Sequence, residues 1–403
     1  MEQSCTTSSS TDRTDTRFPD GTLKAVTKLQ KKQTPAKKLT KAQRRRRRRI
    51  KRIAWRVGLS VLTVVALILV AALMAGYAVF KGPSPTAGDM VTMSMQETSA
   101  LKFVPRIYYS NAEMEEIFAR NSVDNSERET DTSMIVISKP TPEPTPVPDD
   151  YVAPVETTPE PSATPKPENL VVSEDGIEVY RVRAAAYTGY MMIVKDPSRV
   201  TCGVCRDSFN GQKGLQLKDI AKRYNAVAAI NGGGFEDAGG GGNGGTPIGL
   251  VVSEGKLRHS GGDSGDFYAT VGFDRDNKMI ISKMSVEKAK QLGIRDAMTF
   301  GPRLIVNGEP VSVKGQSSGL NPRTAIGQTA TGEVLMLVIE GRQSSSLGAT
   351  YVDLIKIMLE YGAVNAINLD GGSSSLMYYK GEYLNSGVVL TGSRNMPTAF
   401  IVR

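Results

Sequence analysis

The sequence Tyr361-Gly362-Ala363-Val364-Asn365-Ala366-Ile367-Asn368 runs directly into a loop rich in glycine and serine, Leu369 to Ser375. The same pattern occurs earlier as Tyr224-Asn225-Ala226-Val227-Ala228-Ala229-Ile230-Asn231, which runs into Gly232-Gly233-Gly234. A helix-like stretch precedes each copy. Buried strands position the loops that follow them, and loops carry much of the chemistry of proteins. The repeat therefore predicts two helix, strand and glycine-loop units that present equivalent loops to one shared site.

The region around this repeat alternates between patterns typical of strands and of helices. Apolar residues recur at helical spacing in 215–224 and 351–361, whereas the apolar runs 179–186, 303–306 and 334–340 are typical of strands. The tight turn Asn307-Gly308 is typical of a hairpin. We predict an α+β fold with mixed sheets, flanking helices and a duplicated helix, strand and glycine-loop unit, preceded by one transmembrane helix.

The net charge of +9 is concentrated near the N-terminus. Residues 1–56 contain 18 Lys and Arg against 4 Asp and Glu, whereas the remaining residues contain 32 against 37. Residues 57–80 carry no charged side chain. At about 1.5 Å per residue they could cross a hydrocarbon core of about 30 Å as a helix. A run of arginines, Arg44 to Arg49, directly precedes this segment, which argues for a membrane-flanking role and against nucleic-acid binding.

By the positive-inside rule, we expect a single-pass protein of the cell membrane with a cytoplasmic N-terminus and an extracellular C-terminal domain. A cleaved signal peptide is the alternative, but the long preceding tail favours an uncleaved anchor. Ten prolines between Pro140 and Pro167 predict an extended stalk. The expected division is a basic, disordered cytoplasmic tail at 1–56, an anchor at 57–80, a juxtamembrane segment at 81–139 with a helix capped by Asn111, a stalk at 140–170 and a catalytic domain at 171–403.

The small numbers of cysteine and histidine residues argue against several kinds of active site. The chain has three cysteines and one histidine, His259. A Ser-His-Asp triad and a His-rich two-metal centre are therefore not expected. Cys202 and Cys205 form Cys-Gly-Val-Cys, for which a local disulfide is the favoured interpretation and a thioredoxin-like redox motif the less favoured one. No metal site and no cofactor are predicted, although the sequence leaves a divalent cation open.

Two carboxylates stand at the ends of apolar strands, Asp370 after the second copy of the repeat and Glu340 before Gly341-Arg342. A carboxylate next to glycines that let a ligand approach the backbone suits a general acid, base or nucleophile, and glycoside hydrolysis usually needs two. The alternative for each is a capping or hydrogen-bonding role in its loop. Gly239 to Gly245 is either a mobile lid or a segment packed close to a ligand, and a flexible connection without a role in binding is the alternative.

Arginines near the same loops suit an anion. Arg323 lies in Asn321-Pro322-Arg323-Thr324-Ala325, and Arg303 lies in Gly301-Pro302-Arg303. A guanidinium offers a planar fork of donors to a phosphate, and the loop amides and hydroxyls could bind the same group. An ordinary salt bridge is the alternative for each arginine. The predicted substrate-binding residues are Arg323, Arg303, Asn231, Asn368, Gly371, Gly372, Ser373, Ser374 and Arg342.

Five motifs in this order resemble the phosphodiester glycosidase family, over about residues 180–403. They are Ala229 to Phe235, Thr246 to Gly249, Asn321 to Gly327, Glu340 to Arg342 and Asn368 to Ser374. The family usually has Asp where this chain has Glu340. The membrane anchor and the proline-rich stalk lie outside the resemblance and look like those of a bacterial cell-envelope protein.

The resemblance implies a hydrolase that removes a sugar, typically N-acetylglucosamine, from a sugar-1-phosphodiester. Arg323 and the loop from Gly371 to Ser374 would hold the phosphate, and Asp370 and Glu340 would act at the anomeric carbon. The expected partners are an envelope glycan or sugar-phosphate and, through residues 57–80, the membrane; no protein partner can be named. A non-catalytic, membrane-tethered glycan-binding module in envelope polysaccharide assembly and cleavage at the P–O bond remain as alternatives.

Overall fold

The computed structural model describes residues 40–98, 101–124, 126–137, 167–237, 242–261, 268–316, 318–386 and 394–403. The predicted tail up to residue 39, most of the predicted stalk and part of the Gly239 to Gly245 loop lie outside these residues.

The N-terminal helix α1 spans Lys41–Phe80 and is long and apolar enough to cross a membrane. It begins before the predicted anchor, so residues 41–56 are helical where disorder was expected. Arginine and lysine are good helix formers, and a helix already nucleated by the apolar segment can extend through them. Residues 70–403 form one compact unit.

The remaining helices of the described residues are short. In the juxtamembrane segment, α4 begins one residue after Ser110, whose side chain and that of Glu113 form a capping box. The predicted cap Asn111 is therefore the first helical residue instead. The helices are α2 Pro85–Gln96, α3 Pro105–Tyr108, α4 Asn111–Arg120, α5 Leu217–Arg223, α6 Val286–Gln291 and α7 Tyr351–Glu360.

The strands of the described residues form four sheets. From one edge to the other, the eight-stranded sheet consists of β1 Leu170–Glu174, β2 Ile177–Arg183, β3 Thr188–Val194, β15 Val334–Ile339, β14 Arg323–Thr329, β16 Ala363–Leu369, β12 Arg303–Val306 and β13 Glu309–Pro310. One five-stranded sheet consists, in the same sense, of β10 Met279–Ser282, β9 Ala269–Phe273, β11 Asp296–Phe300, β7 Gly249–Ser253 and β8 Lys256–Gly261. The other consists of β18 Glu382–Tyr383, β17 Met377–Tyr379, β6 Ala228–Asn231, β20 Thr398–Val402 and β4 Val200–Val204, and β19 Asn395–Met396 pairs with β5 Leu215–Gln216.

The α+β prediction is confirmed, including the duplicated unit: α5 precedes β6, and α7 precedes β16. The pairings between the named strands are antiparallel, whereas mixed sheets were expected. The physical reason lies in the placement of the two units. The strand β6 belongs to a different sheet from β16, and β15 and β16 lie on either side of β14, so neither helix connects two adjacent parallel strands.

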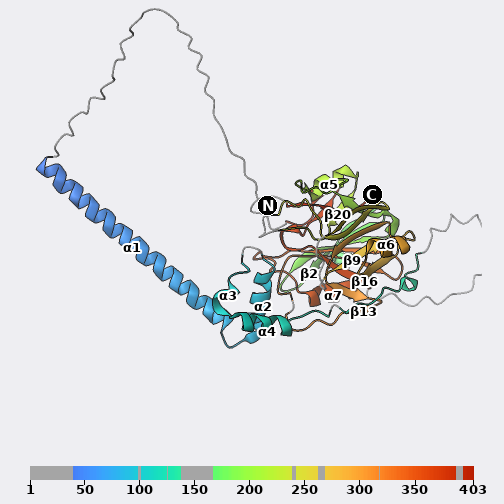
Figure 1. Ribbon diagram of the computed structural model, residues 1–403, viewed down its shortest axis with the longest axis horizontal. Coiled ribbons are helices and arrows are strands. Elements are labelled where there is room, and N and C mark those ends of the chain that lie inside the picture. The colour runs from blue at the N-terminus through green and yellow to red at the C-terminus, as the bar shows by residue number, and fades with distance from the viewer. Residues whose placement is uncertain are drawn as a thin grey trace, which may run out of the picture. The chain divides into compact units, whose positions relative to one another are not determined.

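The core lies between the eight-stranded sheet and the two five-stranded sheets. Alternate residues of β15 face opposite sides, as strand geometry requires. Met336 and Val338 pack into this central core, while Leu335 and Leu337 pack on the other face against α7. Helix α5 covers a five-stranded sheet from outside, and in Figure 1 α5 and α7 lie at opposite edges of the domain. The fold therefore exposes the ends of the stacked sheets, where the strand-end loops gather.

The expected disulfide is absent, because Cys202 and Cys205 are free and buried. Cys202 lies in the middle of β4 and Cys205 directly follows its last residue, and successive side chains of a strand alternate between its two faces. Residues three apart therefore point in opposite directions, and the two thiols belong to different apolar clusters. A disulfide between them would require the strand to rearrange.

Candidate active site

The two glycine-rich loops of the repeat meet. Asn231 ends β6, and its side-chain amide donates a 2.6 Å hydrogen bond to the carbonyl of Asp370, which follows β16. The amide of Asp370 donates in turn to the carbonyl of Gly232 at 3.2 Å. A Cβ on Gly232 would lie 2.6 Å from the hydroxyl of Thr398, so the close packing of this loop against β20 requires glycine. The shared site predicted from the repeat has its structural basis in this contact.

A cavity of about 320 Å³ opens beside this contact. Its volume falls in the range of small-molecule sites, which is about 300–1,000 Å³. Its lining combines carboxylates, guanidinium groups, aromatic rings and loop backbone from distant parts of the chain. The lining residues are Glu97, Asp237, Tyr268, Phe300, Arg323, Arg342, Tyr351, Asn368, Asp370, Gly371, Gly372, Ser373 and Arg394.

Of the carboxylates that line this cavity, that of Asp370 has the pKa furthest from its ordinary value. Burial raises its pKa to about 6, against the nearby hydroxyl of Ser374, the hydrogen bond from the Gly371 amide and the positive charge of Arg394. The negative charge of Asp237 contributes to the rise. A carboxylate that changes charge near neutral pH can exchange protons with a substrate at working pH.

The same shift predicts how stability depends on pH. An aspartate exposed to water has a pKa of about 3.8, and the folded chain raises that of Asp370, so the folded chain binds more protons between about pH 4 and 6. Its contribution to the free energy of unfolding therefore falls as pH rises through this window. We expect Asp370→Asn to be more stable than the wild type by about 3 kcal/mol at pH 7.5. Thermal unfolding followed by near-UV circular dichroism should show this difference at pH 7.5 and little difference at pH 4, and an equal difference at both pH values would contradict the assignment.

A second carboxylate in the cavity, that of Asp237, was not predicted from the sequence. It forms a 2.5 Å ion pair with Arg394, whose guanidinium lies 4.8 Å from the ring centroid of Phe235. Asp237 lies two residues before the glycine-rich segment that begins at Gly239, and Arg394 precedes β19. Neither stands at the end of a long apolar strand, which was the signal that pointed to Asp370.

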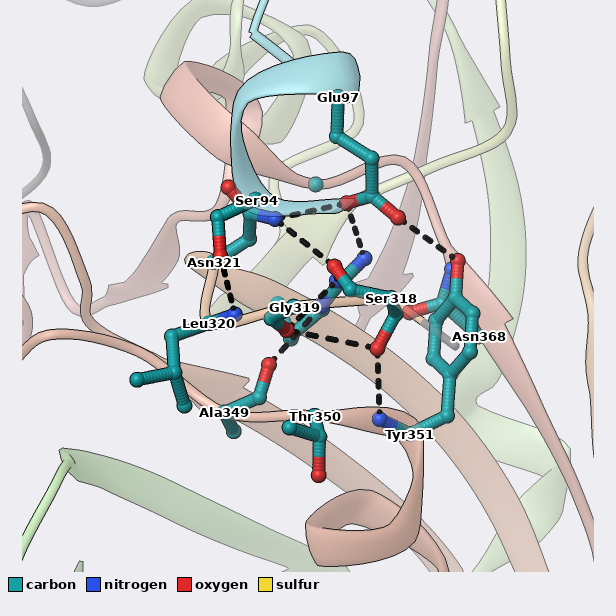
Figure 2. A network of polar contacts seen from close by, with 12 residues as sticks. Ser94, Glu97, Ser318, Gly319, Leu320, Asn321, Ala349, Thr350, Tyr351 and Asn368 are labelled. Carbon is teal, nitrogen blue, oxygen red and sulfur yellow. Dashed lines mark hydrogen bonds and ion pairs between the residues drawn. The ribbon is translucent and has the colours of Figure 1, made fainter. Parts of the chain in front are cut away.

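A third carboxylate comes from outside the predicted catalytic domain. Glu97 follows the last residue of α2, and its Oε2 lies 2.7 Å from Nη1 of Arg323. The side-chain amide of Asn321 donates to the same oxygen at 3.1 Å, and the hydroxyl of Tyr351 donates to Oε1 at 3.4 Å. In Figure 2 the carboxylate of Glu97 points from the juxtamembrane segment towards these residues, with Ser94 beside it contacting the same loop.

Arg323 is held rigidly by its other donors. Nε donates to the carbonyl of Ala349 at 3.2 Å and Nη2 to that of Ser318 at 2.8 Å, while the ring of Tyr351 lies 4.5 Å from the guanidinium carbon. These contacts leave Nη1 to bind Glu97. Arg323 therefore forms a fixed anion-binding group, and the anion bound in this structure is the protein's own carboxylate.

Several other predicted substrate-binding residues also line the cavity. Arg342 donates a 3.0 Å hydrogen bond to the side chain of Asn321, and burial lowers its pKa. Asn368 donates to the carbonyl of Gly301 at 2.8 Å. Gly371, Gly372 and Ser373 contribute the loop that follows Asp370.

The other predicted site residues occupy different positions. Glu340 lines a separate cavity and accepts hydrogen bonds from Thr188 and Ser386. Arg303 is buried in β12 opposite Ile367, and burial lowers its pKa against the charge of Glu127. Asn231 and Ser374 are buried behind the cavity, where both contact Asp370. Asp370 and Glu340 were expected in one cavity, but they line different cavities. The carboxylates that line the cavity together with Asp370 are those of Asp237 and Glu97.

The motifs lie in the part of the chain that matches a known family. Residues 224–403 match the model of the phosphodiester glycosidase family. The resemblance inferred from the sequence is confirmed for this part of the chain, which contains all five motifs. The family acts on phosphodiester-linked sugars, which supports a glycosidase of this kind.

Individual relatives are more distant. A prophage-derived uncharacterized protein of Bacillus subtilis, YomE, is 30% identical over 175 residues, which are 41% of this chain and 26% of YomE. The chain thus spans about a quarter of that relative.

Two solved structures are also similar. The catalytic domain of zebrafish N-acetylglucosamine-1-phosphodiester alpha-N-acetylglucosaminidase, auto-inhibited by its pro-peptide, is 20% identical with a TM-score of 0.47, covering 57% of this chain and 84% of that one. A hypothetical protein from Synechocystis is 18% identical with a TM-score of 0.40, covering 57% and 62%.

Proposed function

We propose that this protein is a membrane-anchored hydrolase that removes a sugar resembling N-acetylglucosamine from a sugar-1-phosphodiester of an envelope glycan. The observation that carries this proposal is the position of Asp370, whose pKa is raised to about 6, in a cavity that also contains Arg323 and Arg342. The arginines can bind the phosphate of a phosphodiester, and a carboxylate of this pKa can act as a general base for attack at the anomeric carbon. The match to the phosphodiester glycosidase family supports the same reaction.

In the proposed reaction, water attacks the anomeric carbon and the bond between that carbon and the phosphate oxygen breaks. The phosphomonoester leaves with the bonding electrons, bound by Arg342 and Arg323. Asp370, ionised above about pH 6, accepts a proton from the water, and Asp237 stabilises the positive charge that develops on the sugar. Phosphate is a good leaving group, so a strong general acid is not required.

The proposal also gives Glu97 a role. Nη1 of Arg323 can bind a substrate phosphate only when the carboxylate of Glu97 has moved away, since the other donors of this guanidinium bind backbone carbonyls. A phosphate oxygen and a carboxylate oxygen are interchangeable partners for a guanidinium. We infer that substrate competes with Glu97 and displaces the end of α2.

The proposed location follows from α1. Its basic N-terminal part would remain in the cytoplasm, and the domain that follows would lie outside the cell membrane, where envelope glycans are accessible. No protein partner is proposed.

The test is product analysis with isotopically labelled water. The full chain in detergent micelles is incubated with the methyl phosphodiester of N-acetylglucosamine 1-phosphate in H₂¹⁸O, and the products are identified by mass spectrometry. We expect methyl phosphate and N-acetylglucosamine that carries ¹⁸O at its anomeric position. Label in the phosphate would mean P–O cleavage instead. Binding of the diester without any product would favour the non-catalytic glycan-binding module.

A further inference from the structure

A second polar cavity, of about 250 Å³, lies next to the turn formed by Glu340, Gly341 and Arg342. It contains two guanidinium groups, a carboxylate, an aromatic ring and two hydroxyls. The lining residues are Arg181, Arg183, Thr188, Gly189, Tyr190, Glu340 and Ser345. This combination of groups suits a sugar phosphate: arginines for the phosphate, a carboxylate and hydroxyls for the sugar hydroxyls, and an aromatic ring for the apolar face of the sugar.

Strand register brings these side chains to one face. Arg181 is paired with Tyr190 and Arg183 with Thr188 across β2 and β3, so all four share a face of the sheet. The guanidinium of Arg181 lies 5.6 Å from the ring of Tyr190 and donates to its hydroxyl at 3.4 Å. Among the described residues, no carboxylate lies at ion-pair distance from either arginine. Their positive charges are therefore available to an external anion.

Glu340 lies beside Thr188 in this cavity, where its backbone amide donates to the carbonyl of Thr188. One of its oxygens accepts a 3.1 Å hydrogen bond from the hydroxyl of Thr188, and the other accepts from the amide and hydroxyl of Ser386 at 2.8 and 3.0 Å. Each carboxylate oxygen thus already binds a hydroxyl group. A sugar hydroxyl could join or replace these donors.

The two cavities are neighbours across a single turn. Glu340 lines the second cavity, and Arg342, two residues later, lines the active-site cavity. Gly341 between them is buried, so a ligand bound in both cavities would pass along the exposed side of this turn. A polymer of phosphodiester-linked sugars carries one phosphate for each repeating unit, so one repeat could lie in each cavity.

We propose that this second cavity, lined by Arg181, Arg183, Tyr190 and Glu340, is a subsite for a neighbouring sugar-phosphate unit of a polymeric substrate. This inference rests on the proposed function for the reaction itself, but the subsite can be tested by binding alone. It makes the protein selective for polymers over single sugar phosphodiesters.

The test compares a long and a short ligand on the full chain in detergent micelles. The long probe is a fluorescently labelled tetramer of phosphodiester-linked N-acetylglucosamine, and the short one is the methyl phosphodiester of N-acetylglucosamine 1-phosphate. We expect Arg181→Ala/Arg183→Ala to raise the Kd for the tetramer about tenfold, because two charge-assisted contacts are lost, while the Kd for the short diester changes less than about twofold. Arg275→Ala, at an exposed position in the turn between β9 and β10, is the matched control and should bind both ligands as the wild type does.

Three outcomes separate the subsite from the proposed function. Equal tetramer binding by the wild type and the double variant would overturn the subsite. Loss of affinity for both ligands in the double variant would overturn it as well, since the effect would then not be specific for the second unit. Tetramer binding that depends on the two arginines, without turnover of either ligand, would support the subsite while contradicting the hydrolase.

Discussion

Replacing Asp370 by asparagine is expected to lower kcat for the sugar phosphodiester about a thousandfold, with little change in Kd. Asparagine is nearly isosteric and can keep the contact with the Gly371 amide, but it cannot accept a proton from the attacking water. General-base catalysis contributes about 10²–10⁴-fold to enzymatic rates, which sets the expected size. The measurement is the initial rate of release of free N-acetylglucosamine, alongside ligand binding by calorimetry.

The pH dependence sharpens this prediction. In the wild type, kcat/KM should rise with pH through about 6, because Asp370 must be ionised to act as a base. The residual activity of Asp370→Asn should lack this rise. Asp276→Asn, at an exposed site between β9 and β10, serves as the control and should keep both the rate and the pH profile. Full activity in Asp370→Asn, or a rate that falls through pH 6 in the wild type, would contradict the role of Asp370 as the base.

The prediction for Asp370 could be made from the sequence because its signal is local. A buried strand that ends in a carboxylate and a run of glycines and serines is visible in a few consecutive residues, and the earlier copy of the pattern indicated a second loop nearby. Asn231 and Asp370 contact each other as that duplication suggested. The helix at 351–360 was likewise predicted nearly to its end, since it follows the side-chain cap of Thr350 and has apolar residues at helical spacing.

Glu340 carries the same local signal, but strand geometry places it elsewhere. The strands β15 and β16 both pair with β14, so Glu340 and Asp370 follow strands two positions apart in one sheet. Val338 and Leu369 pack into the central core. Because side chains alternate along a strand, Glu340 continues on the face of Val338, whereas Asp370 continues on the opposite face from Leu369. Each carboxylate directly follows its strand, but Ile339 is paired with Arg323 and Leu369 with Thr324, and this one-residue difference in register against β14 directs the two groups to different cavities.

The other groups in the cavity could not be predicted from local sequence. Asp237, Arg394 and Glu97 stand in short connections without strand or helix periodicity, and only the tertiary fold brings them to Asp370. Glu97 belongs to the juxtamembrane segment, outside the residues that resemble or match the glycosidase family. Its contact with Arg323 joins positions 97 and 323, and a sequence pattern gives no sign of such a distant pairing.

Glu97→Gln is expected to lower KM for the phosphodiester about 30-fold while changing kcat little. When the protein's own carboxylate occupies the phosphate site, substrate can bind only to the molecules in which that site is free. The apparent affinity for substrate is therefore reduced by the fraction of molecules with a free site. Glutamine can keep hydrogen bonds to Arg323 and Asn321 but loses the charge, and a partly buried ion pair of about 2 kcal/mol corresponds to about 30-fold. The gain should shrink at high salt if screening already weakens the pair in the wild type.

The control for this effect lies in the same segment. Glu116→Gln removes an exposed carboxylate from α4 and should leave KM unchanged, which separates loss of the Arg323 contact from a general change in charge. Arg323 has no other acidic partner at ion-pair distance among the described residues, so in Glu97→Gln its charge becomes available to phosphate. A fall in kcat with unchanged KM would instead mean that Glu97 takes part in the reaction. In that case the juxtamembrane segment would complete the active site rather than occupy it, and substrate would have to bind beside Arg323 without displacing α2.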